Sequence, residues 1–127
     1  LIKLSKNKRF LMLEIKPLST KENLKVLLKE VKNLRNYSLT SFNEKNIINI
    51  YKMKKNLNLG LIIPSTFTCK RVIEKSKKKY VKFLVLEKKF LRIKKLNKIK
   101  KKIYFYTIRD KKLFSQFNNK NLIFEYL

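Results

Sequence analysis

The sequence predicts an α+β fold of the ferredoxin-like, split βαβ type (βαββαβ), in which two helices cover one face of an antiparallel sheet. Two observations predict it. Apolar runs of strand length and amphipathic stretches follow one another in the order strand, helix, strand, strand, helix, strand. A basic segment, residues 65–82, separates the second and third strands, and we expect it to form a long hairpin arm.

The length and composition predict one domain. The chain has 127 residues, of which 44% are hydrophobic, enough for one modest core. We therefore expect residues 1–127 to fold as a single domain. Three basic parts are predicted to lie outside its core: an N-terminal arm at 1–9, the hairpin arm at 65–82 and an insertion at 94–102.

The first strand and helix are predicted by an apolar run followed by a cap signal. Residues 10–15 have the length and composition of a strand, which Pro17 ends. Ser19 and Glu22 have the spacing of a capping box. Apolar residues at helical spacing follow, and they predict an amphipathic helix: Leu24, Leu27, Leu28, Val31 and Leu34.

The middle of the chain is expected to hold the strands that flank the arm. Residues 36–46 are rich in Asn, Ser and Thr, which predicts a loop. Residues 47–53 are interpreted as a strand or the start of one. Residues 59–63 are the strand that enters the arm, and residues 80–93 are the strand that leaves it.

The last third is expected to close the sheet. Residues 103–106 form another strand-like fragment, and residues 121–127 form the last strand. Between them, Thr107 stands three residues before Asp110, an N-cap signal with an acid in the first turn. A short helix follows, with one apolar face made by Leu113, Phe114 and Phe117.

The charge indicates an anionic partner. The net charge is +26, from 34 Lys and Arg against 8 Asp and Glu, far above what a small domain needs for solubility. Such a charge repels itself when the chain compacts, unless a partner compensates it. Nucleic acid and an anionic membrane surface are the two candidates. No apolar run is long enough to span a bilayer.

The residues that chemistry would need are scarce. The sequence has no His, one Cys and one Gly, and its acids are scattered. This excludes a histidine base and a glycine-rich phosphate loop, and it predicts no clustered metal ligands. We therefore expect no enzyme, no cofactor and no metal.

Several stretches resemble protein ten of the small ribosomal subunit. They are IKPLS at 15–19, GLIIPST at 60–66, VIEKS at 72–76, KFLVLEKKFL at 82–91 and NLIFEYL at 121–127. The chain is similar to a divergent, organellar member of that family.

The resemblance implies a structural protein of the subunit head, with ribosomal RNA and neighbouring ribosomal proteins as partners. It implies no small-molecule substrate and no membrane insertion. Lys and Arg would neutralise RNA phosphates. The implied RNA contacts in and beside the arm are Lys70, Arg71, Lys75, Lys77, Lys78, Lys79, Lys88 and Lys89. Those near the insertion are Lys98, Lys100, Lys101 and Lys102.

The composition also suggests where the gene lies. The chain contains no Ala and one Gly, whereas Lys, Asn, Ile, Phe and Tyr, which have A/T-rich codons, are abundant. This predicts a very A/T-rich genome, and we expect an organelle-encoded protein of the mitochondrial ribosome in the matrix.

Three alternatives stay open. One is another organellar ribosomal protein with a different fold. The second is a basic peripheral subunit of an inner-membrane complex, held to anionic lipid by its lysines. The third is an enzyme such as a nuclease or an RNA-modifying activity, which the absence of His disfavours.

Overall fold

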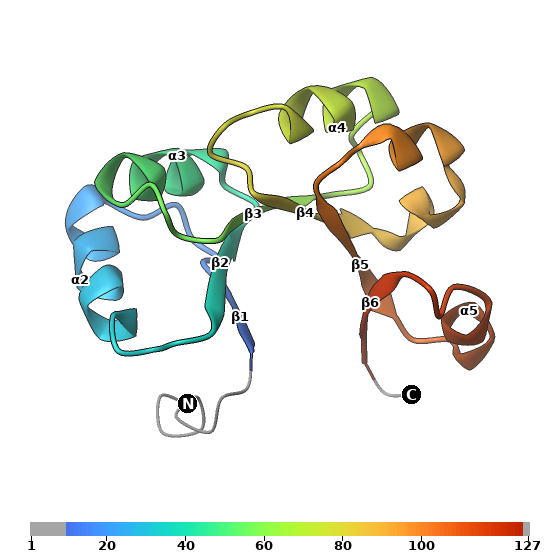
Figure 1. Ribbon diagram of the computed structural model, residues 1–127, viewed down its shortest axis with the longest axis horizontal. Helices are drawn as coiled ribbons and strands as arrows, with labels where there is room; N and C mark the ends of the chain where they lie inside the picture. The colour runs from blue at the N-terminus through green and yellow to red at the C-terminus, as the bar shows by residue number, and fades with distance from the viewer. Residues whose placement is uncertain (1–9, 126–127) are drawn as a thin grey trace. The chain divides into compact units, whose positions relative to one another are not determined.

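The computed structural model describes residues 10–125, so the predicted basic arm at 1–9 lies outside the described residues. The chain divides into two compact units, Leu1–Leu61 and Ile62–Leu127. Strands and helices alternate through each unit (Figure 1).

The first unit holds a parallel three-strand ladder with two helical connections. Strand β2 pairs in parallel with β1 on one side and with β3 on the other. The last two residues of β3 belong to the second unit. The elements are β1 (Leu11–Glu14), α2 (Lys21–Val31), β2 (Tyr37–Ser41), α3 (Glu44–Met53) and β3 (Leu59–Ile63).

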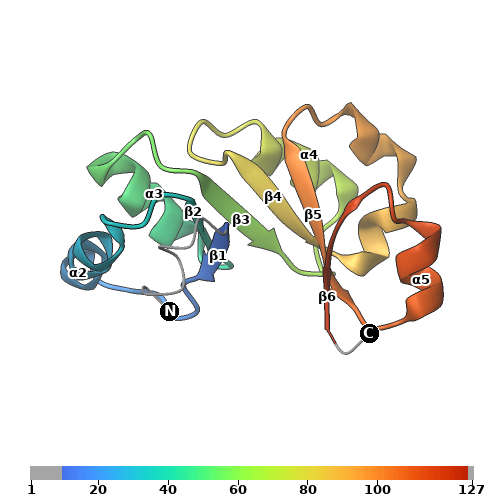
Figure 2. The ribbon, with the colours of Figure 1, turned by 60° about the horizontal axis from the view of Figure 1, so that its bottom comes forward.

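The second unit repeats this plan. Strand β5 pairs in parallel with β4 and with β6, as Figure 2 shows. The connection from β4 to β5 is built from two short 3-10 helices. The elements are α4 (Cys69–Ser76), β4 (Phe83–Glu87), η1 (Lys88–Arg92), η2 (Lys94–Lys98), β5 (Lys102–Ile108), α5 (Lys111–Gln116) and β6 (Asn121–Phe124).

Buried strands supply much of both cores. All five residues of β3 are buried, as are the first four of β4, so each reads as an unbroken apolar run. This is typical of parallel strands, which are covered on both faces. Helix α2 contributes Leu24 and Val31 to the first core. Its N-cap is Thr20, whose hydroxyl accepts a hydrogen bond from the Asn23 amide at 3.2 Å.

The ferredoxin-like prediction is wrong. Within both units each strand pairs in parallel with its neighbour, and the repeated strand–helix order is that of (β/α) barrel proteins. In a split βαβ sheet the strands that lie side by side are antiparallel, because another strand lies between the two that each helix connects. The prediction failed because a short apolar run carries no information on the direction of its neighbour.

The predicted hairpin arm at 65–82 is a helical connection. Thr68 caps α4, because its hydroxyl accepts a hydrogen bond from the Arg71 amide at 3.2 Å. Val72 is completely buried and Ser76, one turn later, is buried as well. This spacing of four residues between buried positions is typical of an amphipathic helix. The lysines between and after them suggested a solvated arm instead.

Two further segments differ from expectation. The predicted loop at 36–46 contains β2 and the start of α3, and the predicted strand at 47–53 is the rest of α3. The polar residues that suggested a loop are buried in the sheet, as Ser38, Thr40 and Ser41 show. The Thr40 hydroxyl donates to the Leu13 carbonyl at 3.3 Å, which satisfies one of them inside the ladder.

The predicted strand at 80–93 is shorter than expected. Strand β4 ends at Glu87, and η1 and η2 follow. The segment 94–102 contains η2 and the first residue of β5, and it contributes the buried Leu96 to the core. Strand β3 confirms the predicted strand at 59–63, and β1 lies within the predicted strand at 10–15.

The buried side of α4 can be tested by stability. We expect Val72→Ala to lower the free energy of unfolding by about 1–3 kcal/mol, because it leaves a cavity in the core. Lys70→Ala, on the exposed side of the same helix, should change it by less than about 0.5 kcal/mol. Urea unfolding measures both. Equal, negligible effects would mean that the segment is a solvated arm after all.

Candidate functional site

The carboxyl ends of parallel strands are where (β/α) proteins place their functional groups, because the loops that follow the strands gather there. In the first unit, Glu14 and Lys16 lie at the end of β1, and Asn43 follows β2. In the second unit, Glu87 and Lys89 lie at the end of β4, and Arg109 follows β5.

Glu14 and Lys16 lie two residues apart at the carboxyl end of β1, on either side of Ile15. Successive side chains of an extended strand point to opposite faces, so residues two apart share a face. The Ile15 amide donates to the Thr40 carbonyl at 2.7 Å, which continues the ladder past Glu14. Ile15 is buried, whereas Glu14 and Lys16 are exposed. The end of β1 therefore presents an acid and a base together to solvent.

Polar side chains from β2 and the loop after it hold the backbone around Lys16. The buried Ser41 hydroxyl donates to the Ile15 carbonyl at 2.7 Å. The Asn43 side-chain amide donates to the Lys16 carbonyl at 3.0 Å. The Asn43 backbone amide donates in turn to the Ser41 hydroxyl at 3.0 Å. Two consecutive carbonyls at the strand end are thus fixed.

Asn46, on α3, completes this network from a fully buried position. Its side-chain amide donates to the Pro17 carbonyl at 2.8 Å and to the Ser41 hydroxyl at 3.2 Å. Its side-chain oxygen accepts from the Ser19 amide at 3.0 Å. Buried polar groups of this kind hold one geometry, because breaking any bond leaves an unsatisfied partner.

The carboxyl ends in the second unit are occupied by internal contacts. The Lys89 ammonium donates to the Ser65 carbonyl. The Tyr106 hydroxyl donates to the Ile63 carbonyl at 3.2 Å. The Glu87 carboxylate accepts from the Lys89 amide at 2.9 Å and so caps η1. These groups stabilise the loops after β3 and β4.

An ion pair lies at the end of β5 and β6. The Arg109 guanidinium contacts the Glu125 carboxylate at 3.0 Å. Their side chains are 63% and 41% exposed, so water screens the pair and it contributes little to stability.

The chemistry available at the end of β1 is electrostatic. Within residues 10–125, no three His, Cys, Asp or Glu side chains lie close enough together to hold a metal ion. The sequence has no histidine to act as a base. An ammonium can neutralise an oxyanion, and a carboxylate can accept a proton. Lys16 and Glu14 offer these two functions on a rigid strand end.

Sequence reasoning did not single out Glu14 and Lys16 as functional. The signal was an acid and a base two residues apart, directly after an apolar strand and before a helix cap. Asn46 gave no signal, because its partners are more than 25 residues away except for Ser41.

The predicted RNA contacts of the arm lie on and after α4. Lys70 and Arg71 are exposed on the helix, and Lys75 is half-buried there. The Arg71 guanidinium stacks on the Phe67 ring, 3.8 Å from its centroid. After the helix come three exposed lysines, namely Lys77, Lys78 and Lys79.

The other predicted RNA contacts are spread from β4 to β5. Lys88 is exposed at the start of η1, and Lys89 makes the contact described above. Lys102 begins β5, with its ammonium 5.2 Å from the centroid of the Tyr104 ring. The remaining exposed residues are Lys98 and Lys100. Contact of these residues with RNA stays a prediction.

Lys101 has a structural role. Its ammonium donates to the Lys78 carbonyl at 2.8 Å and to the Val81 carbonyl at 2.6 Å. Partial burial lowers its pKa, and the nearby positive charge of Lys82 lowers it further. Its amine is therefore engaged with the protein.

Comparison with known proteins identifies the fold. No family model and no curated protein matches the sequence. A phosphodiesterase from Oleispira antarctica, in complex with the product sn-glycerol-3-phosphate, matches 97% of this chain with 18% identity and a TM-score of 0.80. Glycerophosphodiester phosphodiesterases from Parabacteroides distasonis and Agrobacterium tumefaciens match 97% of the chain with 14% and 9% identity and TM-scores of 0.72 and 0.63.

The chain spans about half the length of these structures, covering 54%, 57% and 54% of them. At such low identity the likeness shows the fold. All three proteins carry the name phosphodiesterase, and the chain shares their architecture.

This likeness corrects the functional expectations from the sequence. The resemblance to protein ten of the small ribosomal subunit is wrong, because the parallel (β/α) architecture of the phosphodiesterases replaces the antiparallel fold it implied. The interpretation of the chain as a non-catalytic ribosomal protein is therefore wrong as well. The expected partners, ribosomal RNA and neighbouring ribosomal proteins, and the expected lack of a small-molecule substrate are wrong for the same reason. Short apolar and basic stretches were too common to establish that resemblance.

The buried network at the end of β1 can be tested at Asn46. We expect Asn46→Ala to lower the free energy of unfolding by about 2–4 kcal/mol, because the Ser19 amide and the Ser41 hydroxyl lose a buried partner. Chemical denaturation measures this change. Asn49→Ala on the same helix, at a half-buried position, is the matched control and should cost about 1 kcal/mol or less. Equal costs would contradict the network.

Proposed function

We propose that this chain acts in the hydrolysis of a phosphodiester, with Lys16 and Glu14 at the carboxyl end of β1 as the groups that contact the substrate. The observation that carries the proposal is the match of 97% of the chain to a phosphodiesterase in complex with sn-glycerol-3-phosphate. The position of the two residues supports it, since (β/α) enzymes bind substrate at this end of their strands.

Lys16 would bind the phosphate. Its ammonium is a compact positive charge that neutralises a non-bridging oxygen of the diester and the charge that develops there in the transition state. The backbone on both sides of it is held by hydrogen bonds from Ser41, Asn43 and Asn46. Its Cα is therefore positioned before substrate arrives, and less ordering is needed on binding.

Glu14 would act as the general base. Its carboxylate accepts a proton from a water molecule as the water oxygen forms a bond to phosphorus. The bond from phosphorus to the leaving alcohol oxygen breaks, and that oxygen takes a proton from solvent. The products are a phosphomonoester and an alcohol.

Apolar surface beside these charges suits the rest of a substrate. Leu18 is 63% exposed in the loop after β1, and Phe42 is 45% exposed after β2. Both positions follow a strand at its carboxyl end.

The location in a mitochondrion is part of the proposal and is supported by the A/T-biased composition alone.

The proposed roles predict separate losses of activity. Lys16→Ala should reduce kcat/KM about 100- to 1000-fold, because an oxyanion loses its counter-charge. Glu14→Gln should reduce kcat about 100-fold or more while leaving KM nearly unchanged, because it removes the base and keeps the shape. Release of sn-glycerol-3-phosphate from a glycerophosphodiester by the full-length protein measures both.

Matched controls lie on α2. Lys25→Ala and Glu30→Gln change the same charges at exposed positions of the helix and should leave kcat/KM within about twofold. A wild-type protein that releases no product, or site variants as active as these controls, would refute the proposal.

A further inference from the structure

Seven exposed lysines of the second unit lie in the segments that lead into β4 and β5, at the amino ends of these strands. One group of lysines precedes β4, and another lies on η2 and in the segment that leads into β5. All are exposed. We call this surface the amino-end lysine face, and its members are Lys77, Lys78, Lys79, Lys94, Lys95, Lys98 and Lys100.

Three contacts join these two groups into one surface. The Lys101 ammonium donates to the Lys78 and Val81 carbonyls, which ties the segment before β5 to the segment before β4. Helix α4 packs beside η2, as Figures 1 and 2 show. Lys77 and Lys95 line the same shallow depression together with Ile73.

Acidic residues do not balance this charge. Between residues 75 and 101 the one acid is Glu87, which lies at the opposite end of β4 and caps η1. Glu74 lies beside Lys77 and Lys78 and neutralises part of it. Next to the face, partial burial and then the positive charge of Lys82 lower the pKa of Lys101. A surface of this kind is stabilised by a polyanion.

We propose that the amino-end lysine face binds the surface of a membrane rich in anionic phospholipids. Its members are all lysines on exposed helices and loops, and lysines near an anionic bilayer are attracted without any fixed geometry. Arginine, whose guanidinium binds phosphate in a bidentate geometry and is favoured in nucleic-acid recognition, is not among the members of this face. The proposal is independent of the catalytic roles proposed for Glu14 and Lys16.

The face offers few rings to a single-stranded nucleic acid, since Tyr80, which follows Lys79, is half-buried. Bases stack on exposed aromatic rings. Among residues 10–125 the large hydrophobic side chains that are exposed are Phe10, Leu18, Val26, Phe42 and Phe124, and none belongs to the segments that carry the face.

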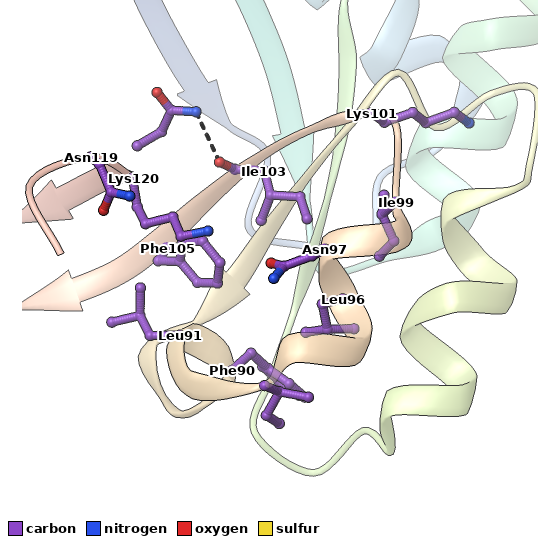
Figure 3. Close-up of a pocket in the computed structure, with 12 residues that line it drawn as sticks. Phe90, Leu91, Leu96, Asn97, Ile99, Lys101, Ile103, Phe105, Asn119 and Lys120 are labelled. Carbon is purple, nitrogen blue, oxygen red and sulfur yellow. Dashed lines mark hydrogen bonds between the residues drawn. The ribbon is translucent and has the colours of Figure 1, made fainter.

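A cavity with both polar and apolar walls lies beside the face. It has a volume of about 390 Å³ and lies between the η1–η2 connection and the first half of β5 (Figure 3). Phe90, Leu96 and Phe105 contribute its apolar wall. The side chains of Asn97 and Lys120 point toward it (Figure 3). An ammonium and an amide of this kind can contact the phosphate of a lipid headgroup.

Docking by this face fixes an orientation. The carboxyl ends of β4, β5 and β6 would point away from the bilayer, because they lie at the other end of the same ladder. Attachment would be peripheral. Within residues 10–125 no helix is long and apolar enough to span a membrane.

The test is vesicle co-sedimentation of the full-length protein. We expect binding to vesicles of phosphatidylcholine with phosphatidylglycerol and none to phosphatidylcholine alone. The triple variant Lys77→Gln, Lys78→Gln, Lys79→Gln should bind about 100-fold more weakly, because each lysine near the surface contributes about 1 kcal/mol. The triple variant Lys94→Gln, Lys95→Gln, Lys98→Gln should show a similar loss by an independent route.

The matched control removes the same charge elsewhere. The variant Lys21→Gln, Lys25→Gln, Lys29→Gln changes three residues of α2 in the first unit and should keep its affinity within about threefold. An equal loss in all three variants would overturn the proposal in favour of non-specific charge attraction. Absence of vesicle binding together with tight binding of an RNA hairpin would overturn it in favour of nucleic acid.

Discussion

Parallel pairing of neighbouring strands is the constraint on which the arrangement of this protein depends. A strand that pairs in parallel with the next must be followed by a crossover, because the chain has to return to the starting edge. Helices α2 and α3 provide the crossovers of the first unit, and the η1–η2 connection and α5 provide those of the second. All strands of a ladder therefore begin at one end of the sheet and finish at the opposite end. Each unit thus has an amino end and a carboxyl end, which carry different groups.

The two ends use charge differently. At the carboxyl end of β1, Lys16 extends from a backbone whose carbonyls are held by the buried side chains of Ser41 and Asn46. That rigidity suits a group that must meet one phosphate in one geometry. At the amino ends in the second unit, lysines such as Lys78 and Lys100 lie on exposed loops. Such charges suit a broad anionic surface, which accepts many geometries.

The sequence was informative where a segment's own pattern decides its structure. The apolar run at 59–63 is β3, and the helical spacing of apolar residues after residue 20 is that of α2, although the N-cap is Thr20 and not the predicted Ser19. It failed at β2, whose buried serines and threonine suggest a loop, and at α4, whose lysines obscure the buried Val72. It also gave no reason to connect Asn46 with the end of β1, because that contact joins residues 27 and 29 positions apart.

The sequence by itself determined the net charge of +26, the lack of histidine and the positions of several strands and helices. These follow from composition and from short-range periodicity. Only the tertiary structure decided that the strands run parallel, and therefore that Glu14 and Lys16 lie at the carboxyl end of β1, whereas Lys77 precedes β4 and Lys98 precedes β5 at the amino ends of those strands. The physical reason is that strand direction is set by backbone hydrogen bonds between distant segments, and a buried strand has the same apolar pattern in either direction.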